Sequence, residues 1–232
     1  MKLRIKFKKY GPIRFIGHLD VMRFFQKAIR RAGIDVTYTS GYSPHQVMTF
    51  AAPLGVGLES NGEYMDIEVN SMTSCQDIKE RLNAASVQGI EIISVKILPE
   101  NAGNAMASVA AAAYTVRFRP GREPSCDISG LLPAFLSREQ ILITKETKKG
   151  SREVDLRPGI YSLSFQENAF YMLLDASSAG NIKPGQVIEA LLAQAGETLA
   201  ENALLITRED VFTRENSENG ALVSLGDIGR AE

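Results

Sequence analysis

The sequence predicts an α+β protein made of two tandem ferredoxin-like units, each with the element order β-α-β-β-α-β and an antiparallel sheet. Segments with apolar residues at every second position alternate with segments whose apolar residues recur every three or four positions, as expected for strands and helices. The element order of residues 1–99 recurs over residues 110–213 without sequence similarity. We therefore expect one domain in each range, and a disordered tail over 214–232, which is polar and rich in glycine.

The first unit opens with a strand over residues 2–10. Leu3, Ile5 and Phe7 would face a core, and the basic residues at positions 2, 4, 6 and 8 would face out. A helix follows over residues 18–32, and Gly33 suits its C-terminal end. The unit continues with a strand at 34–39, a loop rich in Gly, Pro and Ser at 40–60, a strand at 63–69, a helix at 73–85 capped by Thr73 or Ser74, and a strand at 89–98.

The second unit follows residues 99–109, which are typical of a linker or a short helix. Pro184 suits the first turn of its second helix. In chain order we expect a strand at 112–119, a helix at 128–136, a strand at 140–148, a hairpin partner or inserted excursion at 152–156, a hairpin of strands at 161–165 and 170–174, a helix at 183–195 and a strand at 204–212.

The charge is divided unevenly along the chain, although its formal sum is only −1. Residues 1–34 contain ten Lys or Arg and one acid, Asp20, whereas the chain from Glu197 onward contains eight acids and three arginines. The balance excludes a wholly basic nucleic-acid coat. It leaves open a basic surface suited to phosphate backbones, a solvated face, or a face that docks on the protein's own acidic end.

The helix at 18–32 and the loop after residue 40 contain the candidate binding residues. Arg23, Lys27 and Arg30 lie within about 60° of one another on the side opposite the apolar residues, from the ~100° step of a helix. In the loop, Tyr42 could stack on a base or fold back onto the core. Glycine and proline in the segment 41–45 permit unusual backbone angles that would present Tyr42 and His45 together.

The chain has two histidines, His18 and His45, and each has a structural and a functional interpretation. His18 could pack on the end of the sheet or face a ligand at the mouth of the loop. Asp20 could pair with Arg23 at i,i+3 or orient His18. No metal-binding spacing, phosphate-binding loop or nucleophile motif accompanies the histidines, so we expect no metal, no cofactor and no catalytic residue.

Composition also predicts where the protein works. The two cysteines, Cys75 and Cys126, lie far apart with no CxxC run, which argues against an iron–sulfur cluster or a cysteine zinc site. The N-terminus lacks the apolar core of a signal peptide, and no apolar run is long enough to span a membrane. We expect a cytoplasmic protein with no membrane contact.

Several segments together resemble the radical-SAM-linked protein family, a domain of unknown function. They are FIGHLDVMRFFQKAIRRAGI at 15–34, YTSGYSPHQVMTFAAPLGVGLESNGEYMDIEV at 38–69, KGSREVDLRP at 149–158, NIKPGQVIEALL at 181–192 and ITRED at 206–210. Members of that family occur alone or fused behind a radical-SAM region, often one with a cobalamin-binding domain. The resemblance implies an accessory role to such an enzyme and assigns no activity. Its motif residues here are His18, Asp20, Gly41, Ser43 and Pro44.

Two positions depart from the family's pattern. Gly17 stands where the family usually has serine, and Gln46-Val47 stands where it usually has proline and lysine. The missing lysine removes a candidate phosphate contact from the loop, although not from the helix.

We therefore expect a non-catalytic module that binds RNA, either transfer or ribosomal RNA, and works with a separate radical-SAM protein. One alternative is a protein-interaction subunit that docks on this partner without RNA. Another is a metal-independent ribonuclease or hydrolase that uses His18 and His45. The candidate RNA contacts are Arg23, Lys27, Arg30, Arg31, Tyr42 and His45, with His18 beside them.

Overall fold

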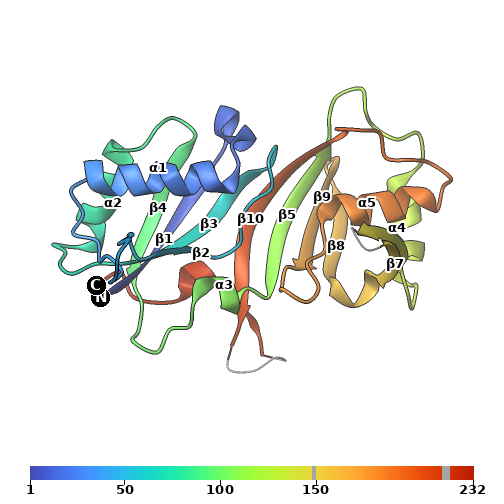
Figure 1. Cartoon of the computed structure of the whole chain (residues 1–232). Coiled ribbons are helices and arrows are strands. Elements are labelled where there is room, and N and C mark those ends of the chain that lie inside the picture. The colour runs from blue at the N-terminus through green and yellow to red at the C-terminus, as the bar shows by residue number, and fades with distance from the viewer. Residues whose placement is uncertain (148–149, 216–219) are drawn as a thin grey trace. The chain divides into compact units, whose positions relative to one another are not determined.

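The computed structural model of the chain describes residues 1–147, 150–215 and 220–232. It is a mixed α+β structure with largely antiparallel strand pairing, and it divides into two compact units (Figure 1). Unit 1 consists of residues 1–110 and 208–232, and unit 2 consists of residues 111–207. Residues from 208 onward belong to unit 1, so unit 2 ends before residue 213, where the sequence places the end of its second domain. Within the described ranges, no helix has both the length and the apolar character needed to cross a bilayer.

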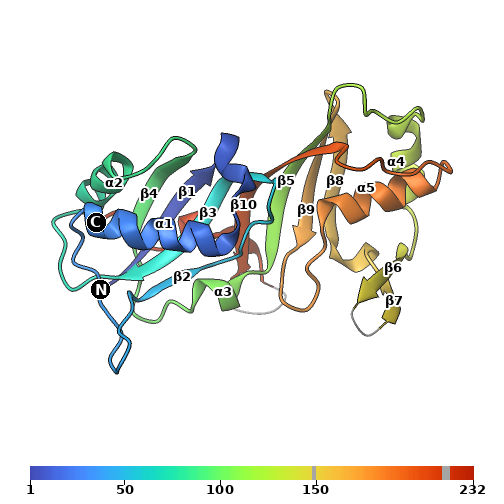
Figure 2. The same cartoon turned by 45° about the horizontal axis from the view of Figure 1, so that its top comes forward.

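Unit 1 is built on a sheet in the order β4-β1-β3-β10, and β1 pairs antiparallel with both of its neighbours. Two helices cover one face of this sheet, and α1 crosses it in both views (Figures 1 and 2). The elements are β1 (Lys2–Lys9), α1 (His18–Arg31), β2 (Met48–Phe50), β3 (Glu59–Glu68), α2 (Cys75–Ala84), β4 (Ile90–Ile97), α3 (Ala105–Ser108), the last part of β10 (Leu204–Arg214), β11 (Leu222–Ser224) and the 3-10 segments η1 (Gly11–Phe15) and η3 (Leu225–Asp227).

The helix-covered face of unit 1 contains its apolar core. Leu3, Ile5 and Phe7 are all but fully buried, as the alternation predicted. They pack against the apolar side of α1, where Phe25 meets Phe7 with ring centroids 4.7 Å apart. Burial of each such side chain contributes about 1.5–3 kcal/mol, so this contact sets the position of α1 on the sheet.

The end of α1 and the start of α2 lie where the residue types predict them. Gly33 has a φ of 60°, a left-handed conformation that favours glycine. The amide of Ile34 then donates to the carbonyl of Ile29 at 3.2 Å, which closes the last turn of α1. At the start of α2, the Ser74 hydroxyl accepts a hydrogen bond from the amide of Asp77 at 3.0 Å.

The prediction of a strand over 34–39 is wrong. Val36 and Tyr38 form only isolated bridges, to Val69 and Gln46. The edge of β3 is instead occupied by β2, which lies within the predicted loop, and by β10. Residues 35–37 still bond beside the end of β3, where the amide of Thr37 donates to the carbonyl of Glu68 at 2.7 Å and the amide of Asn70 donates to that of Asp35 at 2.9 Å, but these contacts are too few to form a regular strand.

Unit 2 has a sheet in the order β10-β5-β9-β8, with the first residues of β10 at its edge. Apolar side chains of α4 and α5 pack on this sheet. The described residues of 140–147 and 150–156 form no part of it, because β6 and β7 pair with each other as a separate two-stranded sheet. The elements are β5 (Ala111–Phe118), α4 (Ile128–Leu136), β6 (Leu142–Thr147), β7 (Gly150–Asp155), β8 (Ile160–Gln166), β9 (Ala169–Asp175) and α5 (Pro184–Ala193), with a 3-10 turn η2 at Arg157–Gly159.

On the other face of the unit 1 sheet the basic residues of β1 pair with acids, one of which, Asp210, belongs to the acidic end of the chain, as one of the three open interpretations expected. Arg4 is buried, and its guanidinium donates two hydrogen bonds to the Asp66 carboxylate at 2.8 and 2.9 Å. Lys6 lies 3.3 Å from the Asp210 carboxylate, and Lys8 lies 3.6 Å from that of Glu91. The predicted outward-facing cations are therefore largely paired within unit 1.

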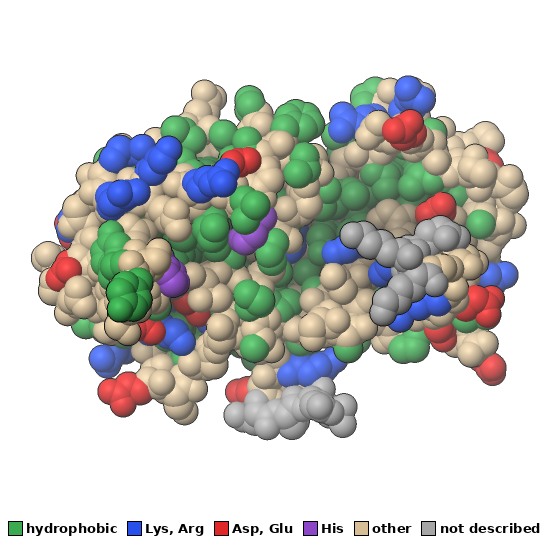
Figure 3. Space-filling model, viewed as in Figure 1, with side chains coloured by type: hydrophobic (Ala, Val, Ile, Leu, Met, Phe, Trp, Pro, Cys, Tyr) green, Lys and Arg blue, Asp and Glu red, His purple; other side chains and the backbone are tan. Residues whose placement is uncertain are grey.

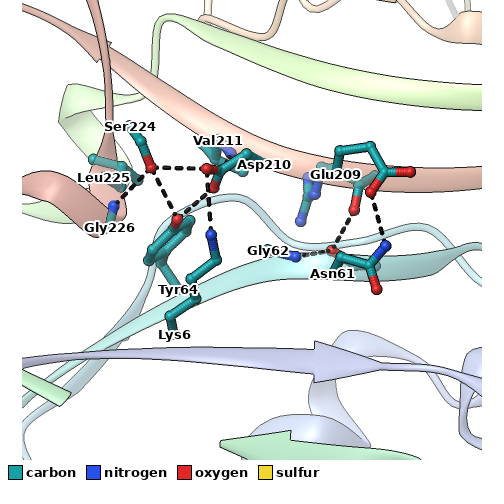
Figure 4. Close-up of polar contacts among 12 residues, drawn as sticks. Lys6, Asn61, Gly62, Tyr64, Glu209, Asp210, Val211, Ser224, Leu225 and Gly226 are labelled. Carbon is teal, nitrogen blue, oxygen red and sulfur yellow. Dashed lines mark hydrogen bonds and ion pairs between the residues drawn. The ribbon is translucent and has the colours of Figure 1, made fainter. Parts of the chain in front are cut away.

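The described part of the C-terminal tail is ordered on this face, contrary to the predicted disorder. β11 pairs antiparallel with β10, and Leu225 is fully buried. Figure 4 shows the polar contacts that hold this segment: the Tyr64 hydroxyl donates to Asp210, and the Ser224 hydroxyl donates to the same carboxylate at 2.8 Å. The amide of Gly226 in turn donates to Ser224 at 3.0 Å. A polar, glycine-rich composition predicts disorder, but the partners that order the described part of this segment lie on distant strands, which composition does not show.

A second buried pair lies where β3 meets β10. The Arg208 guanidinium donates to the Glu63 carboxylate, with Nε 2.9 Å from Oε1, and both side chains are buried. A further bond from Arg208 to the carbonyl of Ala52 joins the loop after β2 to the same site. The pair thus connects three segments of unit 1.

Replacement of Arg208 tests how much the stability of the protein depends on this ion pair. Arg208→Met leaves the Glu63 carboxylate buried without its cation, so we expect a loss of about 3–5 kcal/mol in the free energy of unfolding. Urea denaturation followed by circular dichroism measures the loss. Arg23→Met, which breaks the exposed pair with Asp20, is the matched control and should cost no more than about 1 kcal/mol. Equal losses in the free energy of unfolding for the two variants would show that Arg208 and Glu63 are not a buried, interdependent ion pair.

The Tyr64 network predicts a loss of stability at alkaline pH. Burial, together with the hydrogen bond to Asp210, holds the pKa of the Tyr64 hydroxyl well above its ordinary value of 10.0. Above pH ~10 the unfolded chain releases this proton while the folded chain keeps it, so the free energy of unfolding falls by about 1.4 kcal/mol per pH unit from this group. Below pH ~10 both states hold the proton and the contribution is constant.

Unfolding measured between pH 8 and 11 tests this expectation. Tyr64→Phe should be less stable at pH 8, because its hydroxyl contacts are lost, yet show a shallower decline above pH 10. Tyr42→Phe, at a fully exposed tyrosine, should decline in parallel with the wild type. Parallel curves for all three proteins would show that Tyr64 ionises alike in both states.

Candidate nucleic-acid interface

The outer side of α1 presents an exposed row of cations. Arg23, Lys27 and Arg30 are all exposed, and Figure 3 shows Lys and Arg side chains gathered over this helix. Arg23 makes the predicted i,i+3 pair with Asp20 at 3.2 Å, an exposed contact of small energy. The Nε of Arg30 donates to the carbonyl of Gln26 at 3.3 Å. These contacts leave the guanidinium ends within reach of a phosphate.

Arg31 is arranged differently from the other three. Its Nη2 donates to the carbonyl of Ala85 at 2.8 Å, just beyond the end of α2. Its guanidinium also lies 6.0 Å from the ring centroid of Phe24. Arg31 therefore joins α1 to α2, unlike the other three cations that the sequence analysis names as phosphate contacts.

Residues 39–45 form a closed loop with Tyr42 at its tip. The amide of Thr39 donates to the carbonyl of His45 at 2.8 Å, and the amide of His45 donates to the Thr39 hydroxyl at 3.1 Å. His45 Nδ1 lies 3.1 Å from the same hydroxyl. Gly41, with a φ of 112°, permits the turn. Tyr42 is fully exposed, so the structure favours a presented ring over one folded onto the core.

One backbone carbonyl connects this loop to the helix. Gln46 is buried, and its side-chain amide donates to the carbonyl of Gln26 at 3.2 Å. The same carbonyl accepts the bond from Arg30. The residue that follows the loop is thus bonded to α1, and the cations of the helix and the exposed residues of the loop are considered together. We call this set the α1–loop surface and define it by Arg23, Lys27, Arg30, Tyr42 and His45.

The motif residues Ser43 and Pro44 are exposed in this loop and shape its turn. The carbonyl of Ser43 lies 3.4 Å from His45 Nδ1. Gln46, one of the two departures from the family pattern, has a structural role that proline could not fill in the same way, since its side chain makes the bond to α1. The other departure, Gly17, is the N-cap of α1 and offers no side chain to it.

The two histidines lie in different parts of unit 1. His18 is the first residue of α1, half-buried, and its ring meets that of Phe50 edge-on with centroids 5.2 Å apart. His45 closes the exposed loop, and Figure 3 shows the histidines as two separate patches. The structure therefore does not bring the pair together as an acid and a base. His18 has the packing role that the sequence left open.

Polar residues that the sequence analysis did not single out surround His18. A cavity of about 10 Å³ lies between His18, Lys9 and Glu63, closed by Phe50 and Leu54. This volume suits a single water molecule. Glu63 is held there by its pair with Arg208, as described above. The cavity is thus too small to hold a substrate.

Lys9 is the unusual member of this cluster. It is almost fully buried, and its Nζ donates to the carbonyls of Ile16 and Arg14 at 3.0 and 3.4 Å. Burial lowers the pKa of Lys9, which the nearby Glu63 partly opposes. These bonds hold the segment that leads into α1. The sequence pattern could have indicated that Lys9 is buried, because residue 9 continues the inward-facing positions 3, 5 and 7 of the first strand.

A comparison of the sequence with known protein families finds one match. A family model described as an uncharacterized protein conserved in bacteria (DUF2344) matches residues 2–184. The chain belongs to this family. The DUF2344 match contains all of α1 and the loop, whereas Arg208 and the C-terminal segment lie beyond it. No curated protein matches the chain.

Among the residues with described positions, no three or more His, Cys, Asp or Glu side chains are grouped to hold a metal ion.

The bond between Gln46 and Gln26 predicts how firmly the loop is held. Gln46→Ala removes a hydrogen bond of about 1 kcal/mol, so amide exchange at Thr39 and Val47 should quicken about fivefold. Hydrogen–deuterium exchange measures this rate. Gln76→Ala, which removes an exposed bond to Glu80 on α2, should leave both amides unchanged. Unchanged exchange in Gln46→Ala would mean that the loop is held without this bond.

Proposed function

We propose that the protein is a non-catalytic RNA-binding module and that the α1–loop surface is its RNA contact. The observation that carries this proposal is the shared carbonyl of Gln26, which accepts hydrogen bonds from Arg30 and from Gln46, the residue that follows the loop of Tyr42. Cations that follow a backbone, combined with an exposed aromatic ring, are the elements of single-strand recognition.

Each residue of the surface has a distinct role in this proposal. Arg23, Lys27 and Arg30 contact phosphates, which supplies affinity without sequence preference. Tyr42 stacks on a base, a contact worth about 1–3 kcal/mol. His45 holds the loop through Thr39 and contributes a donor at its rim. The pairing of Arg4, Lys6 and Lys8 within unit 1 supports α1 as the cationic face, since those charges are already neutralised.

We further propose that this module is an accessory to a separate radical-SAM protein in the cytoplasm. The support is the resemblance of its motif segments to the radical-SAM-linked family. Transfer RNA or ribosomal RNA is the proposed ligand.

We also propose that both units are variants of the ferredoxin-like fold. Unit 2 supports this directly, because its sheet order β10-β5-β9-β8 equals the 4-1-3-2 order of that fold once the β6–β7 excursion is set aside. Unit 1 keeps the neighbours β4-β1-β3, and β2 and β10 share the place of the remaining strand. Fold analogy alone supports no function.

A salt titration of RNA binding tests the proposed function. The wild type should bind small RNA with an affinity that falls as salt rises, at a log–log slope of roughly −0.7 per phosphate contact for a single strand. The triple variant Arg23→Glu/Lys27→Glu/Arg30→Glu should lose about 2 units of that slope and most of the affinity.

A charge-matched control separates this surface from general electrostatics. Arg117, Arg122 and Arg138 are exposed in unit 2, and their triple replacement by glutamate changes net charge equally. This control should keep the wild-type slope. Equal losses in the two triple variants would overturn the α1–loop surface. No RNA binding by the wild type at low salt, together with a saturable 1:1 complex with a radical-SAM protein, would favour the protein-docking alternative.

A further inference from the structure

We infer that unit 2 carries a second RNA contact, in which Lys145 and Arg152 hold one phosphate of the backbone between them. The two residues lie on a ribbon formed by β6 (Leu142–Thr147) and β7 (Gly150–Asp155), which we call the β6–β7 ribbon. The inference rests on the proposed function, because its ligand is the same RNA. It concerns the other unit, however, and uses no residue of the α1–loop surface.

The β6–β7 ribbon lies outside the main sheet of unit 2 and projects from the unit (Figure 2). Two strands alone are only marginally stable, so the ribbon depends on the contacts at its base. There, Ile143 and Val154 pack against the core of unit 2. The Asp155 carboxylate also accepts hydrogen bonds from the amides of Ile141 and Arg157, both at 2.9 Å. These contacts fix where the ribbon leaves unit 2.

The register of the ribbon places two cations directly opposite each other. Lys145 is the antiparallel partner of Arg152, so their Cβ atoms are about 4.5–5.5 Å apart. Because side chains alternate between the faces of a strand, this pair follows Ile143 and Val154 on one face, and Glu153 belongs to the other. Like charges directly opposite each other destabilise paired strands. The outer part of the ribbon therefore contains a repulsive pair.

Neither cation of this pair forms an ion pair with any residue that the structure describes. Arg152 is exposed and Lys145 is half-buried. The sheet of unit 1 differs in this respect. Arg4 also lies opposite a lysine, Lys96, but Asp66 on its other side neutralises it. The ribbon thus keeps two charges available to an external anion.

The chemistry of the pair suits a phosphate. An oxyanion between Lys145 and Arg152 replaces their repulsion with charge-assisted hydrogen bonds, and phosphate oxygens accept such bonds from both residue types. Two contacts on an exposed ribbon hold a free phosphate ion only weakly. A nucleic-acid backbone adds neighbouring charges, which the ribbon also attracts, since residues 145–152 contain four Lys or Arg and one acid. We therefore assign the site to the RNA backbone.

Two of those four cations, Lys148 and Lys149, lie outside the described residues. They enter the argument only as charges of the sequence. The proposed site consists of Lys145 and Arg152.

A salt titration of RNA binding with paired variants tests the inference. Lys145→Gln/Arg152→Gln should lose about 0.7 units of the log–log slope, equal to one phosphate contact, and bind about fivefold more weakly at low salt. Arg117→Gln/Arg122→Gln is the matched control, because it removes two exposed cations of the same unit and changes the net charge equally. The control should keep the wild-type slope. An unchanged slope in the ribbon variant, or an equal loss in the control, would overturn the inference.

Hydrogen–deuterium exchange of the free protein separates a lost contact from a damaged ribbon. Because Lys145→Gln/Arg152→Gln removes a repulsion, the amides of β6 and β7 should exchange about twofold more slowly than in the wild type, although RNA binding is weaker. Unchanged or faster exchange would mean that the pair contains no repulsion for a phosphate to relieve, and it would overturn the inference.

The same exchange measurement on the wild type distinguishes two sources of the anion. RNA should slow exchange of the ribbon amides at a salt concentration where it binds. Inorganic phosphate should have no more effect than chloride at equal ionic strength. Equal protection by inorganic phosphate would mean that the ribbon takes a free anion, and the assignment to the RNA backbone would fail.

Failure of this inference is distinguishable from failure of the proposed function. If the wild type shows no salt-dependent RNA binding, the proposed function fails. If Arg23→Glu/Lys27→Glu/Arg30→Glu loses slope but the ribbon variant does not, the proposed function stands and the inference fails. If only the ribbon variant loses slope, the inference stands and the α1–loop surface fails. If the ribbon variant weakens only a complex with an acidic protein, the ribbon serves a protein partner and the inference is overturned.

Discussion

Two carboxylates buried in β3 are the constraint on which the rest of unit 1 depends. Glu63 and Asp66 lie in the same strand, and each needs a cation because an unpaired buried charge is very costly. Asp66 takes Arg4 from the neighbouring strand, but Glu63 takes Arg208 from a strand 145 residues further along the chain. A buried ion pair adds little net stability, since desolvation offsets most of the attraction. Its consequence here is positional, because β10 must lie where Arg208 reaches Glu63.

The position of β10 in turn explains the other features of unit 1. With β10 and β2 beside most of β3, residues 34–39 pair only with its end, at Glu68 and Val69, and then lead into the loop of Tyr42. The chain after β10 returns over the outer sheet face, where Asp210 and Ser224 meet Tyr64. This return contacts Arg4, whose guanidinium donates to the carbonyl of Leu225 at 3.5 Å. The cations of α1, on the opposite face, remain exposed.

The candidate surface therefore depends on where charge is neutralised more than on where it is abundant. The N-terminal region is rich in Lys and Arg, yet Arg4, Lys6, Lys8 and Arg14 each face an acid within unit 1. Arg31 is bonded at the end of α2. Arg23, Lys27 and Arg30 keep their charges toward solvent because they lie on the side of α1 opposite its apolar residues. The same amphipathic pattern that buries Phe25 thus produces the proposed RNA contact.

Local physics made much of this protein predictable from its sequence. Periodicity placed α1, its cationic side and the core residues of β1, and Gly33 and Ser74 marked helix ends, because each depends on residues within a few positions. Tyr42 and the turn around Gly41 were likewise recognisable from the loop composition. Only the tertiary structure decided four other features: which strand lies beside β3, the burial of Lys9, the separation of the histidines and the order in the described part of the C-terminal segment. Each depends on a partner far away in the chain, such as Arg208 for Glu63, and no local pattern specifies which distant charge or strand will arrive.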